Sequence, residues 1–228
     1  MYVPDAIGPR PAVIMYPDAG GLRASFRDMG ARLASLGFVT LVPDVYYRTP
    51  YEPFTMDTAF TDDGERKRLF LLMRGLTSEM VVSDASGLLD FLAARHEVRG
   101  DAVGTTGYCM GGRLSLVVAG HHGERIAAAA SFHGGNLAVE NDPASPHHLA
   151  ERVRASVYVA GSINDASFTD DQRELLSASY AAAGVRCTIE TYEALHGFAV
   201  PDNPTYDDAA AERHWAAMAA FFTSQLVD

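Results

Sequence analysis

The chain has 228 residues, of which 48% are hydrophobic and 21% charged, and its formal net charge is −11. This composition is ordinary for one globular domain, which we expect to span residues 1–228. The negative charge disfavours nucleic acid and anionic membranes as partners, and no apolar run approaches the roughly 20 residues that cross a bilayer. With two cysteines and no basic or apolar leader at its start, the chain is predicted to be soluble and cytoplasmic.

Short apolar runs alternate with helical patterns. In chain order we expect a strand at 12–16, a helix at 25–37, a strand at 38–43, a helix at 78–94, a strand at 102–108, a helix at 110–119, strands at 126–133 and 156–161, a helix at 170–183, a strand at 185–192 and a helix at 209–226. This alternation predicts an α/β fold, a mostly parallel sheet with helices on both faces. Residues 48–64 are expected to form a long loop, a type of segment that is often functional.

Three residues lie within a few positions after the ends of expected strands. In parallel sheets, sites form at the carboxyl ends of the strands. Cys109, Asp165 and His196 occupy such positions, in the chain order nucleophile, acid, histidine.

The stretch "GYCMG" at 107–111 matches a nucleophile elbow with cysteine in place of serine. Glycines two positions on either side of Cys109 leave room for a sharp strand-to-helix turn, and a helix N-terminus favours the reactive thiolate. The alternative is that Cys109 is a small buried hydrophobe between glycines that merely pack a strand on a helix. Cys187 shares a strand face with Val185 and Ile189, and we assign it to the core.

His196 lies in the loop "EALHGFAVPD" and is the candidate base; the alternative is a surface loop histidine. Asp165 is the candidate to orient its imidazole, with Asp202 as runner-up. His133, at a strand end, ranks lower as a base and is expected to line the pocket. No Cys/His spacing resembles a zinc site, so we expect no metal.

An oxyanion hole would come from backbone N–H groups. One donor would be Met110, directly after the nucleophile, and the other Ala19 or Gly20 in the loop "PDAGG" at 17–21. Several aromatic side chains are candidate pocket walls, with ordinary core packing as the alternative: Tyr46, Tyr47, Phe54, Phe60 and Phe198.

The stretches "YPDAGGLR", "FRDMGARLASLGFVTLVPDVYYR", "GYCMGG", "AGSINDASF" and "HGFAVPD" together resemble the dienelactone hydrolase (carboxymethylenebutenolidase-like) family of the α/β-hydrolase superfamily, over nearly the whole chain. The resemblance implies a single-domain α/β-hydrolase without a cofactor, acting on small ester or lactone substrates. It also implies a catalytic triad of Cys109, His196 and Asp165 that forms a thioester acyl-enzyme.

Two positions depart from the family pattern. Asp18 stands where the family carries a glutamate that interacts with the resting cysteine, and it is expected to contribute to substrate binding. Val200 stands where the family has an arginine that holds the substrate carboxylate. The basic cluster 66–68 could supply another anion anchor, but we interpret it as the solvated start of a helix. The family's first strands are expected to be absent or shortened.

Two other functions remain open at this point. The fold could serve a non-hydrolytic small-molecule-binding protein. Cys109 could also be a redox-sensing thiol, although Cys187, assigned to the core, is a poor resolving partner. The chain is expected to be a monomer or a homodimer, since its last helix could pair. Whether the loop 48–64 acts as a lid is left open.

Overall fold

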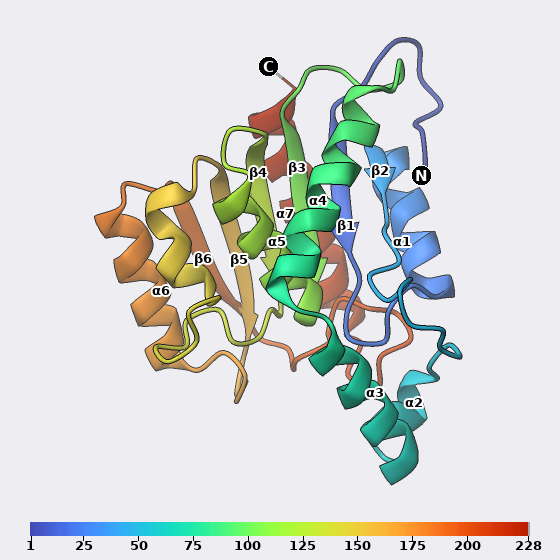
Figure 1. The fold of residues 1–228 in the computed structure, drawn as a ribbon, viewed down its shortest axis with the longest axis vertical. Coiled ribbons are helices and arrows are strands. Elements are labelled where there is room, and N and C mark those ends of the chain that lie inside the picture. Colours follow the sequence, from blue (N-terminus) through green and yellow to red (C-terminus); the bar gives the residue numbers. More distant parts are fainter. Residues whose placement is uncertain (228) are drawn as a thin grey trace.

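The computed structural model describes residues 1–227 and contains one six-stranded sheet with the order β2-β1-β3-β4-β5-β6 (Figure 1). The strands are β1 (Ala12–Tyr16), β2 (Val39–Leu41), β3 (Val103–Tyr108), β4 (Ile126–Phe132), β5 (Ser156–Ser162) and β6 (Cys187–Tyr192). Every neighbouring pair is parallel. β1, β3 and β5 are buried at every position, as expected for parallel strands covered on both faces.

Long helices cover both faces of the sheet (Figure 1). They are α1 (Ala24–Ser35), α4 (Ser78–Ala93), α5 (Met110–His121), α6 (Asp170–Ala182) and α7 (Asp208–Leu226). Two apolar cores result: Phe26 of α1 and Phe222 of α7 belong to one, and Leu89, Leu116 and Leu176 of α4, α5 and α6 belong to the other. This arrangement confirms the predicted α/β fold.

The expected loop 48–64 contains helical structure. α2 (Met56–Ala59) lies inside it, and α3 (Asp63–Gly75) begins before its end. α3 buries only Leu69 fully, so its apolar pattern is weak; the side chain of Asp62 caps the helix by accepting the N–H of Glu65 over 2.9 Å. The basic cluster 66–68 therefore does lie near the start of a helix. Both helices project beyond the carboxyl ends of the strands (Figure 1).

Smaller differences concern the edges of elements. The strand expected at 38–43 is only three residues long in β2, and a short 3-10 helix, η1 (Pro146–Arg152), had no counterpart in the sequence pattern. Near the start of the chain, Tyr2 pairs with Thr40 in an isolated antiparallel bridge. Within residues 1–227, no helix combines the length and apolar character needed to cross a membrane.

Candidate active site

Cys109 occupies the sharp turn between β3 and α5. Its φ of 53° lies in the left-handed region, which costs a residue with a side chain about 1–3 kcal/mol. Gly107 and Gly111 permit this turn: a Cβ on Gly107 would overlap the carbonyl of Gly111, and a Cβ on Gly111 would overlap the carbonyl of Tyr16. The N–H of Cys109 donates to the carbonyl of Phe132 on β4 over 3.1 Å. The turn thus places the thiol at the N-terminal end of α5, where it lines a cavity.

Asp165 and His196 meet beside this turn. Asp165 follows β5, His196 follows β6, and Nδ1 of His196 donates to Oδ2 of Asp165 over 2.8 Å. The buried carboxylate also accepts the hydroxyls of Ser162, at 2.8 Å, and Ser167, at 2.6 Å, as well as the N–H of Ser167, at 2.9 Å. Because Nδ1 is bound to the carboxylate, Nε2 is the ring nitrogen left for the thiol of Cys109.

The charges of this cluster depend on one another. Burial lowers the pKa of His196, but its hydrogen bonds with Asp165 and Cys109 outweigh burial and raise the pKa to about 10. Burial raises the pKa of Asp165, but its hydrogen bonds with His196, Ser167 and Ser162 outweigh burial and hold the pKa below its usual range. With this pKa His196 is an imidazolium at neutral pH, and it is paired with the ionised carboxylate of Asp165.

The loop after β1 lies next to the thiol. The N–H of Gly20 donates to the side chain of Asp18 over 2.9 Å and is therefore already engaged. In the part of the chain described, the N–H groups of Ala19 and Met110 have no hydrogen-bond acceptor, and both residues line the same cavity as Cys109. Of the two donors considered in this loop, Ala19 is the one available to a substrate.

The cavity around Cys109 has a volume of about 640 Å³. The predicted site residues that line it are Asp18, Ala19, Cys109, Met110, Asp165 and His196. α2, α3 and the residue that follows α2 contribute four apolar side chains to the wall: Met56, Phe60, Phe70 and Met73. Of these, only Phe60 was a candidate from the sequence. Segment 48–64 thus contributes part of the wall through α2 and Phe60.

Four predicted substrate-binding residues lie behind the cavity wall. Gly20 is tied to Asp18, as described, and Tyr46 is buried with its hydroxyl donating to the carbonyl of Ala19 over 3.0 Å. His133 and Phe198 are buried beneath His196, with ring centroids 5.1 Å apart for His133 and His196 and for His133 and Phe198. These four residues therefore lie behind the residues that line the cavity and support them, and they do not line the cavity themselves.

The two remaining aromatic candidates also lie elsewhere. Tyr47 lines a different cavity, and Phe54 is buried under the guanidinium of Arg68, which lies 3.7 Å from its ring centroid.

Burial lowers the pKa of His133 well below its ordinary value, so this imidazole is neutral.

Arg23 is an important residue that sequence reasoning did not single out. Its buried guanidinium binds both oxygens of Asp18, at 2.6 and 2.9 Å, and both oxygens of Asp202, at 2.7 and 2.8 Å. Asp18 therefore pairs with Arg23, and no hydrogen bond joins it to Cys109 among the described residues. Asp202, the runner-up acid, binds Arg23, and the carboxylate that binds His196 is that of Asp165.

Cys187 lies far from the site. It belongs to β6, which is separated from β3 by two strands, or about 14 Å at the usual spacing. Both cysteines are free, and burial raises the pKa of Cys187 to about 12. The fold therefore does not offer Cys187 as a resolving thiol for Cys109. Over residues 1–227, no three His, Cys, Asp or Glu side chains are grouped in a way that would hold a metal ion.

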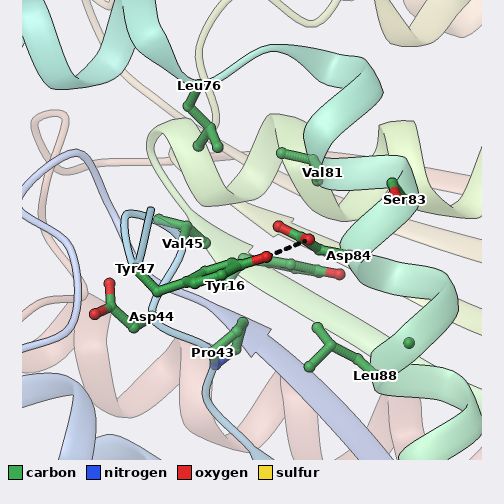
Figure 2. Close-up of a pocket in the computed structure, with 11 residues that line it drawn as sticks. Tyr16, Pro43, Asp44, Val45, Tyr47, Leu76, Val81, Ser83, Asp84 and Leu88 are labelled. Carbon is green, nitrogen blue, oxygen red and sulfur yellow. Dashed lines mark hydrogen bonds between the residues drawn. The ribbon is translucent and has the colours of Figure 1, made fainter. Parts of the chain in front are cut away.

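A second cavity, of about 440 Å³, lies between the loop after β2 and α4 (Figure 2). Tyr16 lines it with a buried hydroxyl, and the hydroxyl of Tyr47 donates to Asp84 over 3.1 Å. Of the described residues that line this cavity, none also lines the cavity of Cys109.

Known proteins are similar to this chain over most of its length. A protein of Escherichia coli strain K12 named "Putative carboxymethylenebutenolidase" is 28% identical over 222 residues, which cover 94% of this chain and 77% of that protein. A crystal structure of a dienelactone hydrolase-like promiscuous phosphotriesterase from metagenomic libraries is 27% identical, with a TM-score of 0.76 over 97% of this chain and 89% of that one.

A more distant structure, a thermophilic esterase of Thermogutta terrifontis, is 17% identical, with a TM-score of 0.67 over 97% of this chain and 85% of that one. At this identity the likeness shows the fold alone. The model of the dienelactone hydrolase family matches residues 1–226. The chain therefore belongs to the dienelactone hydrolase family of hydrolases, as its motifs indicated.

Proposed function

We propose that this enzyme hydrolyses small esters or lactones through a thioester formed on Cys109. The name of the Escherichia coli relative supports a lactone or ester as the substrate. The observation that carries the mechanism is the position of His196, whose Nδ1 binds Asp165 at 2.8 Å and which lines the same cavity as Cys109. The cavity of about 640 Å³ at this cluster has the size of a small-molecule site.

In the resting enzyme Nε2 of His196 holds the proton of the Cys109 thiol, because a pKa of about 10 keeps the imidazole protonated, and in the first half of the reaction the thiolate sulfur attacks the carbonyl carbon of the substrate. The oxyanion that forms accepts hydrogen bonds from the free N–H groups of Ala19 and Met110. When the intermediate collapses, the C–O bond breaks and the leaving oxygen takes the proton from His196. With a lactone, the released hydroxyl stays on the same molecule as the acyl group.

In the second half, His196 removes a proton from a water molecule, and the resulting hydroxide attacks the thioester. The C–S bond breaks, the carboxylic acid leaves, and the thiolate of Cys109 is restored beside His196, which keeps the proton taken from water. Asp165 stays ionised throughout, since its hydrogen bonds keep its pKa below the usual range, and it stabilises the imidazolium that forms in each half.

Trapping the acyl-enzyme tests this mechanism. After rapid acid quench of a reaction with a p-nitrophenyl ester, peptide mass spectrometry should find the acyl group on Cys109. We expect Cys109→Ala to lose the adduct and to reduce kcat/KM on the order of 10⁴-fold or more. Cys187→Ala is the matched control and should retain both. Undiminished turnover in a folded Cys109→Ala variant would overturn the mechanism.

Alkylation kinetics give a second test. Iodoacetamide should label Cys109 rapidly well below pH ~8.5, the ordinary pKa of cysteine, and His196→Ala should abolish this rapid labelling. Equal labelling rates in the two proteins over the whole pH range would contradict the activation of Cys109 by His196.

We also propose that the enzyme acts in the cytoplasm as a monomer or homodimer, without nucleic acid or membrane partners. Two free cysteines fit a reducing compartment, and a net charge of −11 disfavours polyanionic partners. Cell fractionation and the molar mass from light scattering test these two statements directly.

A further inference from the structure

We propose that this site prefers uncharged esters with a bulky apolar group and discriminates against substrates that carry a carboxylate. The inference deepens the proposed ester hydrolysis at Cys109 and rests on it. Its basis is the chemistry of the side chains that line the cavity. Many of them are apolar, and the charged ones are either already paired or negative.

The apolar wall comes from α2, α3 and the residue after the nucleophile. Met56, Phe60, Phe70, Met73 and Met110 line the cavity. Phe60 and Phe70 remain 44% and 42% exposed, although large aromatic side chains gain by burial. These two helices project beyond the sheet (Figure 1), and both rings line the cavity while remaining partly open to solvent. Exposed aromatic side chains beside methionines around a cavity indicate an apolar ligand, and methionine adapts to irregular shapes.

Of the three acidic residues that line the described part of the cavity, two are neutralised by a cation and one is not. Asp18 is paired with Arg23, and Asp165 is paired with His196. Asp57, in the first turn of α2, is exposed and adds a further negative charge to the wall. A substrate carboxylate that enters this cavity loses water and meets like charges, which is costly unless a cation compensates it.

Arg113 is the one Lys or Arg side chain among the described residues that line the cavity. Its Nη2 donates to Oδ2 of Asp142 over 2.6 Å, and its Nη1 donates to the carbonyl of Asn136. The positive charge of Arg113 is therefore neutralised by Asp142, and the orientation of its guanidinium is fixed before a substrate arrives.

The other cations considered as anion anchors do not reach the site. Arg66 pairs with Asp63. Arg68 pairs with Glu65 at 2.6 Å and stacks on a ring away from the cavity. Val200, at the position where an arginine was considered, is 0% exposed in the core under α7. An anionic substrate would thus meet no free cation in the described part of the cavity.

A matched pair of substrates tests the inference. One is the p-nitrophenyl monoester of adipic acid, and the other is its isostere with a terminal isopropyl group in place of the carboxylate. We expect kcat/KM to be about 100-fold higher for the isopropyl ester, the scale of discrimination that one pocket contact provides. Equal values, or a preference for the adipate ester, would overturn the proposal.

Two variants locate the effect. Met73→Lys places a cation in the apolar wall and should shift the ratio of kcat/KM toward the adipate ester at least about 10-fold. Leu71→Lys adds the same charge on the same helix at a position that is 70% exposed and does not line the cavity, and it should leave the ratio unchanged. A shift of equal size in both variants would mean that general charge, and not the cavity wall, sets the preference.

A binding measurement separates this inference from the proposed function. The corresponding p-nitroanilides lack the ester, and their ability to protect Cys109 from iodoacetamide reports binding alone. We expect the isopropyl compound to protect at a concentration about 100-fold lower than the adipate compound. If neither ester is hydrolysed but this difference is found, the proposed function fails and the ligand class stands. Equal protection overturns the ligand class whatever the turnover.

Discussion

The guanidinium of Arg23 contacts both carboxylate oxygens of Asp18, at 2.6 and 2.9 Å, in the interior of the protein. The same group binds Asp202, which lies six residues after His196 in the chain. Because Asp18 also fixes the N–H of Gly20, Arg23 joins the loop that carries Ala19 to the loop that carries the histidine. We infer that Arg23 positions these two loops relative to each other.

Arg23→Met should destabilise the fold and impair turnover. Removal of the guanidinium leaves the buried carboxylate of Asp18 without a cationic partner, which typically costs about 3–5 kcal/mol in the free energy of unfolding. If Arg23 positions the loop of Ala19, kcat should fall more than KM rises. Urea denaturation and steady-state kinetics measure the two effects.

A matched pair of controls distinguishes burial from charge in this prediction. Arg125→Met breaks the more exposed pair between Arg125 and Asp90, and the cost should be below about 1 kcal/mol. The double variant Asp18→Asn with Arg23→Met should be more stable than Arg23→Met alone, because no buried charge is left unpaired. An Arg23→Met protein as stable as Arg125→Met would contradict the role assigned to the buried pair.

The glycines of the elbow give a prediction about shape alone. Gly107→Ala should prevent correct folding or abolish turnover, because its Cβ would overlap the backbone of Gly111, which cannot move away as a side chain can. Gly87→Ala is the control: no atom lies within 4 Å of a Cβ at this position in α4, so the variant should gain about 0.5–1 kcal/mol in stability. Thermal unfolding and kcat/KM of the two variants decide the matter, and a native-like Gly107→Ala enzyme would contradict the geometry of the turn.

The sheet and the meeting of Cys109, Asp165 and His196 were predictable because each depends on local rules. Buried parallel strands are continuous apolar runs, and the ends of such strands converge at one edge of the sheet. The glycines of the elbow lie two positions before and two positions after Cys109, because a Cβ at either position would overlap neighbouring backbone atoms. For these reasons the sequence was sufficient to predict that the candidate site residues lie close together.

The apolar wall and the Arg23 pair were not predictable in the same way. α3 buries only Leu69 fully, so its periodic signal is weak, and the four residues of α2 are too few for any helical period to show. The partners of Arg23 lie 5 and 179 residues away in the chain, and no spacing rule links such positions. Tyr46 and Phe198 were expected at the cavity surface, but which side of a loop an aromatic residue faces is decided by tertiary packing.

The stability of the protein should depend on the protonation of His196. Its pKa in the folded state, about 10, is above the value of about 6.5 for an unfolded chain. Protonation of His196 therefore stabilises the fold fully below about pH 6.5, and this contribution is lost as the pH rises toward 10. Denaturation of wild type and His196→Gln over this range should show a difference in unfolding free energy that shrinks with rising pH. A difference that grows with pH would contradict the raised pKa.

Ser167→Ala should weaken the site without changing its reacting groups. The hydroxyl of Ser167 donates to Asp165 over 2.6 Å, and a hydrogen bond to a charged group contributes about 1.5–3 kcal/mol. Its loss should raise the pKa of Asp165, lower that of His196, and reduce kcat/KM by about 10-fold. NMR titration of the His196 ring and steady-state kinetics measure both effects. Ser179→Ala is the control, because this hydroxyl donates to the carbonyl of Leu175 within α6, and neither quantity should change. If Ser167→Ala also leaves both unchanged, the hydroxyl of Ser162 and the N–H at position 167 suffice to hold the carboxylate in place.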